Sequence, residues 1–577
     1  MPQPAPSPDS GAGRDLFRLL LLTALLIGAG LGLRAPWPAD EPRFALVAQH
    51  MAVSGNWLFP SIGGDLYADK PPLFFWLMAV CLKLTGSLRI AFLLPALLSA
   101  LGIVALVHDL VRRLHGRVAA LCAAGTLAAT LQFVTVMRGA QIDPLLCFLT
   151  TLSLYALLRH LLLGPAWGWY FLGAFAAGLG VITKGVGFLP LLVLIPYALL
   201  RARFWKAGAW QGLAGVRSAW RWAVLGLGGL LLAVALWLVP MLVAVQLTGN
   251  ADFAAYRDEI LFRQTVTRYA RAWIHVEPWY YFIVSVIPGL WLPWTPLLFW
   301  LVPRWQQDWS ARRAATWLPL LWLALVLAFF SASTGKRGLY IFPALPALAL
   351  AAAPWLPQLY ARPAVRRVGL ILAAVLALVA VAVAVLYLTG LTRLAQLARD
   401  NQISQPLPLI LIAFTAVVAW LLAWRRAPLL AWPGVLLALV LGWALLLMPD
   451  MDGLRSGRSF TQLLMRSVPP GQPLGLVAYK EQFLLYIDRP VTNFGHSRSA
   501  EGPQSSRQEE ADAARWLNAA AGRRLLIPAI RARACFADTH QVPLGESGGR
   551  DWLLVDGQAS AECAGRGQER TYVANPE

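Results

Sequence analysis

Apolar runs long enough to cross a membrane dominate the pattern of this chain. They are about 18–22 residues long, which matches the roughly 30 Å hydrocarbon core of a bilayer, and short polar or basic segments separate them. The pattern predicts a polytopic α-helical membrane protein with about 13 transmembrane helices. The predicted spans are residues 16–34, 89–111, 118–137, 143–163, 167–183, 186–200, 222–246, 279–302, 316–333, 338–357, 367–389, 407–424 and 428–448.

Residues 72–86 decide the predicted topology. This segment, PLFFWLMAVCLKLTG, is apolar but short and carries Lys83 near its end, so we interpret it as a helix lying at the membrane interface. With that interpretation, the short basic loops gather on one side, which the positive-inside rule makes cytoplasmic. These loops are 112–117, 201–221, 303–313, 361–367 and Arg425–Arg426. The loops 35–88 and 247–278 are then periplasmic.

The pattern changes after Met448, where the apolar spans end. Short apolar stretches that are typical of strands alternate with a helical stretch, so we expect an α/β domain on the periplasmic side. The predicted strands are 474–487, 523–530 and 551–555, and the predicted helix is 509–521. The expected organisation is therefore a disordered cytoplasmic N-terminus (1–15), a transmembrane domain (16–448) and a periplasmic α/β domain (449–577).

The charge distribution excludes a nucleic-acid-binding protein. The chain has 577 residues, is 58% hydrophobic and has a formal net charge of +20. Residues 449–577 contain 15 basic and 15 acidic side chains, so the whole surplus lies in the membrane part. Positive cytoplasmic loops and contacts with anionic lipids account for it. The length of the first apolar run and the lack of a small-residue cleavage site predict a retained span rather than a signal peptide.

The loop after the first span concentrates charge at the edge of the membrane. It contains Asp40, Glu41 and Arg43, and then Asp69 and Lys70 before two prolines. Charge at this depth is costly, which favours a functional role over a filling one. Asp40 is expected to accept a proton from an acceptor group or to orient that group, while Arg43 and Lys70 are expected to bind a phosphate.

Later loops on the same face add further candidates. Each one also has a structural explanation: Asp143–Pro144 suits a helix start, and Lys184 suits a helix end. Taken together, the residues predict a water-filled cavity with two carboxylates and several phosphate donors. The second carboxylate is Asp143, the further phosphate donors are Lys184, Lys336, Arg337 and Tyr340, and Glu41 and Arg138 are expected to line the cavity.

Two weaker signals concern metals and cysteines. His275 and Glu277 could bind a divalent metal together with Asp69, although an ordinary surface histidine is the simpler interpretation of this weak pattern. Cys535 and Cys563 either form a disulfide in an oxidising compartment or are two free thiols.

Four motifs resemble one enzyme family in their order along the chain. They are ADEPRFALVAQHMAVSGNWLFPSIGGDLYADKPPLFFWL, RGAQIDPLL, LGVITKGVGFLP and STGKRGLYIFPALPALAL. They resemble the integral-membrane glycosyltransferases of the aminoarabinose transferase (ArnT) and protein O-mannosyltransferase group, which have the GT-C fold. The resemblance covers roughly residues 15–350. One departure is Asp69, where the family usually has Glu before the lysine.

The resemblance implies an inverting glycosyltransferase of the bacterial inner membrane whose active site faces the periplasm. Asp40 matches the family's catalytic Asp, and Asp143 its second loop carboxylate. Arg43, Lys70 and Tyr340 match positions that bind the carrier phosphate. The implied donor is an undecaprenyl-phosphate sugar similar to aminoarabinose, and the implied acceptor is lipid A or another envelope molecule.

Two alternatives stay open at this stage. A protein or glycan O-glycosyltransferase would use the same chemistry on another acceptor. A lipid or glycan transporter would show internal repeats and helices broken near the midplane, and we find no repeat. We expect a monomer that contacts membrane lipids and requires no organic cofactor. Whether it uses a divalent metal stays open.

Overall fold

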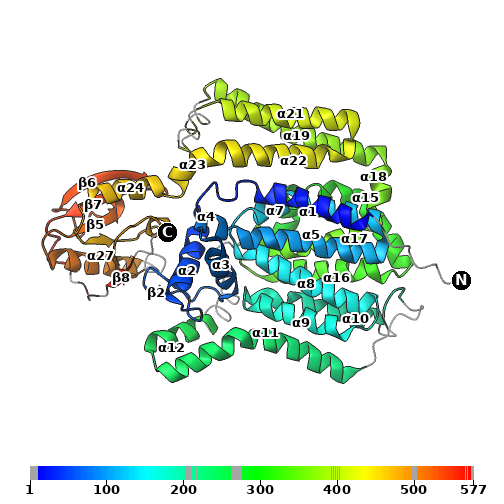
Figure 1. Cartoon of the computed structure of the whole chain (residues 1–577), viewed down its shortest axis with the longest axis horizontal. Helices are drawn as coiled ribbons and strands as arrows, with labels where there is room; N and C mark the ends of the chain where they lie inside the picture. The colour runs from blue at the N-terminus through cyan, green and yellow to red at the C-terminus, as the bar shows by residue number, and fades with distance from the viewer. Residues whose placement is uncertain are drawn as a thin grey trace.

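The protein is a bundle of long helices with a smaller α/β lobe at one end (Figure 1). The computed structural model describes residues 11–573, except 202–209, 215–217, 262–275, 496–502 and single positions within 392–404 and 564–568. The helices of the bundle and its loops are α1 (Ala12–Gly28), α2 (Glu41–Ser54), α3 (Leu73–Thr85), α4 (Leu88–Ala91), α5 (Leu94–His115), α6 (Arg117–Ala128), α7 (Leu131–Met137), α8 (Ile142–Leu162), α9 (Trp167–Val181), η1 (Gly185–Val193), α10 (Leu194–Arg201), α11 (Ala219–Thr248), α12 (Ala251–Asp258), η3 (Phe282–Val286), α14 (Ile287–Leu290), α15 (Trp294–Ser310), α16 (Ala314–Ala332), η4 (Gly338–Ala344), α17 (Leu345–Ala352), α18 (Leu356–Ala361), α19 (Pro363–Leu388), α21 (Leu407–Arg426), η5 (Pro428–Leu430), α22 (Ala431–Gly442) and η6 (Trp443–Leu447).

The structure does not confirm the predicted count of thirteen spans. Within the described residues, 7 helices are long and apolar enough to cross a membrane, or up to 9 if each of two bent pairs is one span. The bent pairs are α6 with α7, at 60°, and η3–α14 with α15, at 109°. Other predicted spans are helical but short: α1 has 17 residues and α9 has 15.

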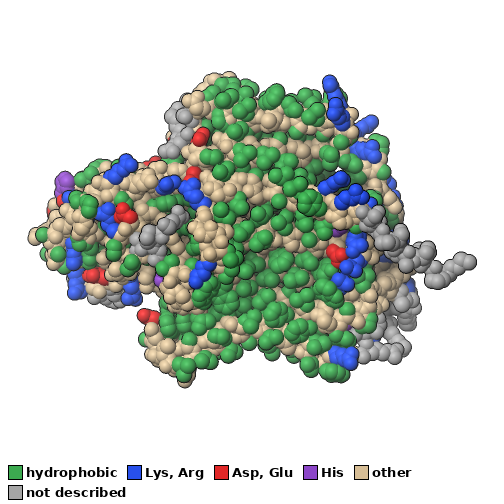
Figure 2. Space-filling view, viewed as in Figure 1, with side chains coloured by type: hydrophobic (Ala, Val, Ile, Leu, Met, Phe, Trp, Pro, Cys, Tyr) green, Lys and Arg blue, Asp and Glu red, His purple; other side chains and the backbone are tan. Residues whose placement is uncertain are grey.

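The two ends of the bundle differ in charge. Figure 2 shows hydrophobic side chains over the length of the bundle and Lys and Arg gathered at the end where α1 begins. At that end Arg112 and Arg113 bind Asp109, and Arg117 binds Asp15 of α1. Helix α1 begins at Ala12, so the prediction of disorder up to residue 15 is wrong for residues 12–15. An acidic residue in the first turn stabilises a helix start, and Asp15 also has a partner there.

The loop between α1 and α4 forms a compact layer at the opposite end. It contains α2, α3 and a two-stranded hairpin of β1 (Ser61–Ile62) and β2 (Asp65–Leu66). The helix α3 covers Leu73–Thr85 and has 13 residues, which is shorter than a span. Phe44 of α2 packs on Phe74 and Phe75 of α3, with ring centroids 5.7 and 5.6 Å apart.

Residues beyond Met448 continue the last long helix before they form the lobe. The helical stretch runs from Pro428 to Ser467 and includes α23 (Met448–Arg455) and α24 (Arg458–Ser467). A six-stranded sheet follows in the order β6-β7-β5-β3-β4-β8. Its strands are β3 (Leu474–Leu476), β4 (Val491–Asn493), β5 (Arg524–Pro528), β6 (His540–Ser547), β7 (Arg550–Asp556) and β8 (Arg570–Tyr572), with the helices α25 (Glu481–Leu484), α27 (Pro503–Asn518) and η7 (Ala529–Arg531).

The predicted elements of the lobe agree with the structure in part. Strands β5 and β7 and helix α27 coincide with predicted segments, whereas the predicted strand 474–487 is wrong beyond Leu476 because the chain turns into α25. The strands β3, β4 and β5 are parallel, and β6, β7 and β8 are antiparallel additions. A disulfide joins Cys535 to Cys563, with Cα atoms 5.8 Å apart.

The lobe and the layer of α2 and α3 share one hydrophobic core. Met51, Phe75 and Met78 of the layer belong to the same buried cluster as Phe483 and Trp552 of the lobe. In Figure 1 the lobe lies beside α2, with α3 behind it. The lobe is therefore packed onto the layer that carries the predicted catalytic loop.

Candidate active site

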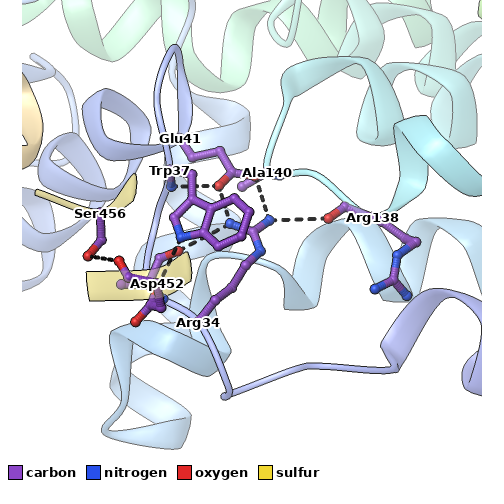
Figure 3. A network of polar contacts seen from close by, with 8 residues as sticks. Arg34, Trp37, Glu41, Arg138, Ala140, Asp452 and Ser456 are labelled. Carbon is purple, nitrogen blue, oxygen red and sulfur yellow. Dashed lines mark hydrogen bonds and ion pairs between the residues drawn. The ribbon is translucent and has the colours of Figure 1, made fainter. Parts of the chain in front are cut away.

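The start of α2 is fixed by a buried carboxylate. The Glu41 side chain accepts hydrogen bonds from both terminal nitrogens of Arg34, from the Trp37 amide at 2.9 Å and from the Ala140 amide at 3.0 Å (Figure 3). Glu41 and Arg34 are both buried. Glu41 therefore joins the first loop to the loop before α8, and the prediction that it lines an open cavity is wrong.

Arg138 also has a structural role instead of the predicted role in the cavity. Its guanidinium donates to the carbonyl oxygens of Leu26, at 2.7 Å, and Ala29, at 2.9 Å. The last carbonyl groups of a helix have no partner within the helix, so Arg138 satisfies the end of α1. Its own carbonyl oxygen accepts from Arg34 at 3.3 Å, which connects it to the Glu41 network.

The structure brings Asp143, Lys184 and Tyr340 together from three separate loops. Asp143 lies in the first turn of α8, Lys184 precedes η1, and Tyr340 lies in η4. The Lys184 Nζ atom donates to Asp143 Oδ1 at 2.8 Å and lies 5.1 Å from the centroid of the Tyr340 ring. A carboxylate, an ammonium group and a phenol thus form one polar cluster at this end of the bundle.

The segment that carries Lys70 contacts the segment that carries Lys184 through a backbone hydrogen bond. The amide of Leu73, just after Lys70 and the two prolines, donates to the Ile182 carbonyl at 3.3 Å. Ile182 is two residues before Lys184, so the two lysines lie on adjoining segments. Lys70 is half-buried and donates to the Asp69 carbonyl at 3.1 Å, and Asp69 is exposed.

Tyr67 lies between the charged residues of the first loop. Burial raises the pKa of its phenol, the charges of Asp69 and Asp40 add to this rise, and Arg43, which also hydrogen-bonds to it, opposes the rise. Asp40, Arg43 and Asp69 therefore lie close enough to Tyr67 for their charges to act on its phenol. Asp40 itself is half-buried, and within the described part of the chain no hydrogen bond engages its carboxylate. Asp40 is therefore available to contact an acceptor.

Arg43 has a partner that the sequence did not predict. Its Nε and Nη2 atoms donate to Glu481 Oε1 at 3.0 and 2.7 Å. Glu481 belongs to the C-terminal lobe, 438 positions along the chain. Burial alone would lower the pKa of Arg43, but Glu481 and Tyr67 raise it above its usual value. Arg43 therefore stays charged.

The loop before η4 separates its two basic residues. Lys336 is buried, and its Nζ atom donates to the carbonyl oxygens of Glu277, at 2.8 Å, and Ser333. It therefore fixes the loop, in contrast to the predicted phosphate contact. Arg337 is exposed, and its carbonyl oxygen accepts from the Tyr340 amide at 2.9 Å.

Two other predictions have different outcomes. No group of three metal-ligating side chains occurs among the described residues, but His275 lies outside them, so the predicted metal site with Asp69 and Glu277 is untested. A small cavity beside the site is lined by none of the predicted residues. Its lining is Ala35, Pro36, Leu88, Arg89, Arg458, Leu485 and Tyr486.

Comparison with known sequences identifies the family. Over 448 residues the chain is 34% identical to the undecaprenyl phosphate-alpha-4-amino-4-deoxy-L-arabinose arabinosyl transferase of Pseudomonas aeruginosa strain UCBPP-PA14, and the match covers 73% of this chain and 74% of that protein. The chain belongs to the ArnT-like family. A relative from Pseudomonas fluorescens strain Pf-5 is 31% identical over 350 residues, covering 58% of this chain and 59% of that protein.

Membership of the ArnT-like family confirms the prediction of a membrane glycosyltransferase. A sequence model described as dolichyl-phosphate-mannose-protein mannosyltransferase also matches residues 69–219. The crystal structure of ArnT from Cupriavidus metallidurans bound to undecaprenyl phosphate superposes with a TM-score of 0.72 at 20% identity, covering 97% of this chain and 100% of that one. Its apo form has the same TM-score, at 21% identity. This likeness confirms the GT-C fold.

Sequence reasoning missed Tyr67 and Glu481. Tyr67 lies in the same motif as Asp69, so its position in the first loop was a usable signal. Glu481 lies in a domain with balanced charge, where no local pattern sets it apart. Only the folded structure brings it to Arg43.

Proposed function

We propose that this chain transfers a sugar, aminoarabinose or a close relative, from undecaprenyl phosphate to lipid A or another envelope acceptor. The donor and the sugar are those in the names of its relatives. The observation that carries the proposal is the cluster of Asp143, Lys184 and Tyr340, whose segments contact those of Lys70, through Leu73 and Ile182, and of Asp40, through Glu41 and Ala140. This set combines carboxylates with cations, which the transfer requires.

In the proposed reaction, the acceptor oxygen attacks the anomeric carbon and the bond from that carbon to the carrier phosphate breaks. Asp40 accepts the proton of the acceptor hydroxyl or aligns its oxygen. The leaving polyprenyl phosphate takes the electron pair of the broken bond. Lys70, Arg43 and Lys184 stabilise the negative charge that grows on it. Asp143 holds Lys184 in position through their ion pair.

The proposed location of the site is the periplasmic face of the bacterial inner membrane. Arg112, Arg113 and Arg117 lie at the opposite end of the bundle, and short basic loops favour the cytoplasm. The C-terminal lobe lies at the same end as the site (Figure 1), so we place it in the periplasm as well. Its disulfide suits that oxidising compartment.

We further propose that the reaction needs no cofactor, because basic side chains supply the positive charge at the leaving phosphate. Chelator-treated enzyme should transfer sugar at the rate of untreated enzyme. A loss that added divalent metal restores would instead support a site that includes Asp69 and Glu277.

The decisive experiment measures sugar transfer by purified protein. Asp40→Asn and Lys70→Ala should each reduce the rate at least a hundredfold, since each removes a group that acts on the reacting atoms. The exposed residues Asp252 and Lys83 provide matched controls, and Asp252→Asn and Lys83→Ala should keep the wild-type rate. A near-wild-type rate in Asp40→Asn would overturn the site assignment.

The acceptor is tested in cells that produce the protein. Mass spectrometry should find lipid A carrying the added sugar only when the gene is present and Asp40 is intact. Unchanged lipid A together with an altered glycan or protein would retain the chemistry and replace the acceptor. Release of polyprenyl phosphate from a labelled donor distinguishes both outcomes from a transporter.

A further inference from the structure

One arginine of the proposed phosphate site is held by the C-terminal lobe. Arg43 directs its Nε and Nη2 atoms to the same oxygen of Glu481, at 3.0 and 2.7 Å. The Arg43 side chain is 28% exposed and the Glu481 side chain 14%, so the pair is largely shielded from water. Such shielding makes the contact stronger than an ordinary surface ion pair.

The Glu481 carboxylate is presented by a rigid part of the lobe. It begins α25, and Phe483 in the same helix is fully buried. The Phe483 ring lies 4.9 Å from the ring of Phe460 and 5.1 Å from that of Trp552. These residues also belong to the core shared with α2 and α3, so Glu481 keeps its place relative to Arg43.

The remaining hydrogen-bond donors of Arg43 fit a phosphate. A guanidinium group has five N–H donors. Glu481 takes two of them, through Nε and Nη2, and the buried Tyr67 phenol also interacts with the group. A bidentate contact with a phosphate uses two donors, so the contact with Glu481 leaves enough donors for one. Glu481 therefore orients the guanidinium without using all of its donors.

We propose that Glu481 is a positioning residue for the carrier phosphate, through which the C-terminal lobe completes the active site. This inference rests on the proposed function, because it takes the anion at Arg43 to be a polyprenyl phosphate. Glu481 acts by accepting the hydrogen bonds of Arg43, so an amide oxygen at the same place performs much of the same task.

The test compares variants of the full-length protein for transfer kinetics and for binding of undecaprenyl phosphate. Glu481→Ala should raise KM for the donor and weaken carrier binding about tenfold, with kcat within threefold of wild type. That loss corresponds to one hydrogen bond to a charged group. Glu481→Gln should stay within threefold of wild type in every readout. Asp488→Ala, which removes an exposed carboxylate of the same lobe, is the control and should change nothing.

A double-mutant cycle with Arg43→Ala separates positioning from folding. In the Arg43→Ala background, Glu481→Ala should change carrier binding less than twofold. An equal loss in both backgrounds would overturn the proposal, as would tighter carrier binding by Glu481→Ala, which would make Glu481 a competitor of the phosphate. If Glu481→Ala does not fold, Glu481→Asp withdraws the carboxylate and serves in the same cycle.

The two readouts distinguish this inference from the proposed function. A wild-type protein that binds undecaprenyl phosphate but transfers no sugar contradicts the proposed function, while the binding cycle still decides the role of Glu481. A protein that transfers sugar without coupling between Arg43 and Glu481 contradicts only the inference. A wild-type protein that neither binds the carrier nor transfers sugar contradicts both.

Discussion

Neighbouring charged residues in the first loop have opposite tasks. Asp40 is half-buried and its carboxylate has no hydrogen bond among the described residues, whereas Glu41 is buried and its carboxylate has several partners. A buried carboxylate needs such partners, because an unpaired one costs several kcal/mol. The same chemical group thus serves the proposed reaction at one position and the fold at the next.

Replacing Glu41 should therefore damage stability before it damages chemistry. Glu41→Ala leaves the buried Arg34 without its carboxylate partner and should cost about 3–5 kcal/mol. Thermal unfolding of the purified protein would show a large fall in Tm for this variant. Asp40→Asn, the matched neighbour, should keep the wild-type Tm while losing transfer. If Glu41→Ala keeps the wild-type Tm but loses transfer, Glu41 acts in the reaction and not in the fold.

Sequence alone could predict part of the site at this scale. The charged loops and their order along the chain could be identified from the sequence. Asp143 and Lys184 were expected on one face, and they form an ion pair. The roles of Glu41 and Arg138 could not be predicted, because each contacts a distant segment: Glu41 binds the Ala140 amide 99 positions away, and Arg138 binds carbonyl groups 109 to 112 positions away. A local pattern shows that a charge is present, but not which groups fold against it.

At the scale of elements, the local sequence pattern predicts the helices but not where they bend. The apolar pattern predicted spans at 118–137 and 279–302, and both are bent in the structure. The bends face each other: the Leu131 amide donates to the Leu292 carbonyl at 3.0 Å, and Trp294 donates to Thr130 at 2.8 Å. Hydropathy reports that a segment is apolar, whereas such contacts between segments decide where it breaks.

The disulfide is the element-scale feature that most directly supports the lobe. Cys535 and Cys563 are 28 positions apart, and closing a loop of this size stabilises a fold by about 3.5 kcal/mol in the chain-entropy estimate. The double variant Cys535→Ser, Cys563→Ser should lose most of that stability. Limited proteolysis should then cut the lobe faster than in wild type.

A matched control for this experiment is Cys122→Ser, which removes a free cysteine in α6 of the bundle. This variant should keep the wild-type rate of proteolysis in the lobe. Equal resistance of the double variant and wild type would contradict a stabilising role for the disulfide.

At the scale of the whole molecule, the lobe and the layer of α2 and α3 form one packed unit. Asp452 of α23 accepts hydrogen bonds from the Ala35 amide at 2.8 Å and from Trp37 Nε1 at 2.9 Å (Figure 3). These bonds hold α23, the helix that leads into the lobe, against the first loop. Arg570 of β8 binds Asp65 of the hairpin at 2.9 Å. Together with the shared core, these contacts hold the lobe on the loop that carries Asp40 and Lys70.

Removing the lobe should therefore abolish transfer, although every predicted catalytic and phosphate-binding residue lies before position 449. A chain ending at Met448 loses one side of the shared core and exposes Met51, Phe75 and Met78. It also leaves Arg43 without Glu481. We expect the membrane bundle to remain inserted, the layer of α2 and α3 to be cut quickly by protease, and transfer to fall below detection.

Glu481→Ala in the full-length protein is the comparison that separates the two losses. It removes the contact with Arg43 and keeps the core, so its layer of α2 and α3 should resist protease as in wild type while carrier binding weakens. A truncated chain with a protease-resistant layer and wild-type transfer would show that the lobe acts elsewhere. If the truncated chain keeps a protease-resistant layer and binds the carrier as weakly as Glu481→Ala, the lobe contributes only the Glu481 carboxylate.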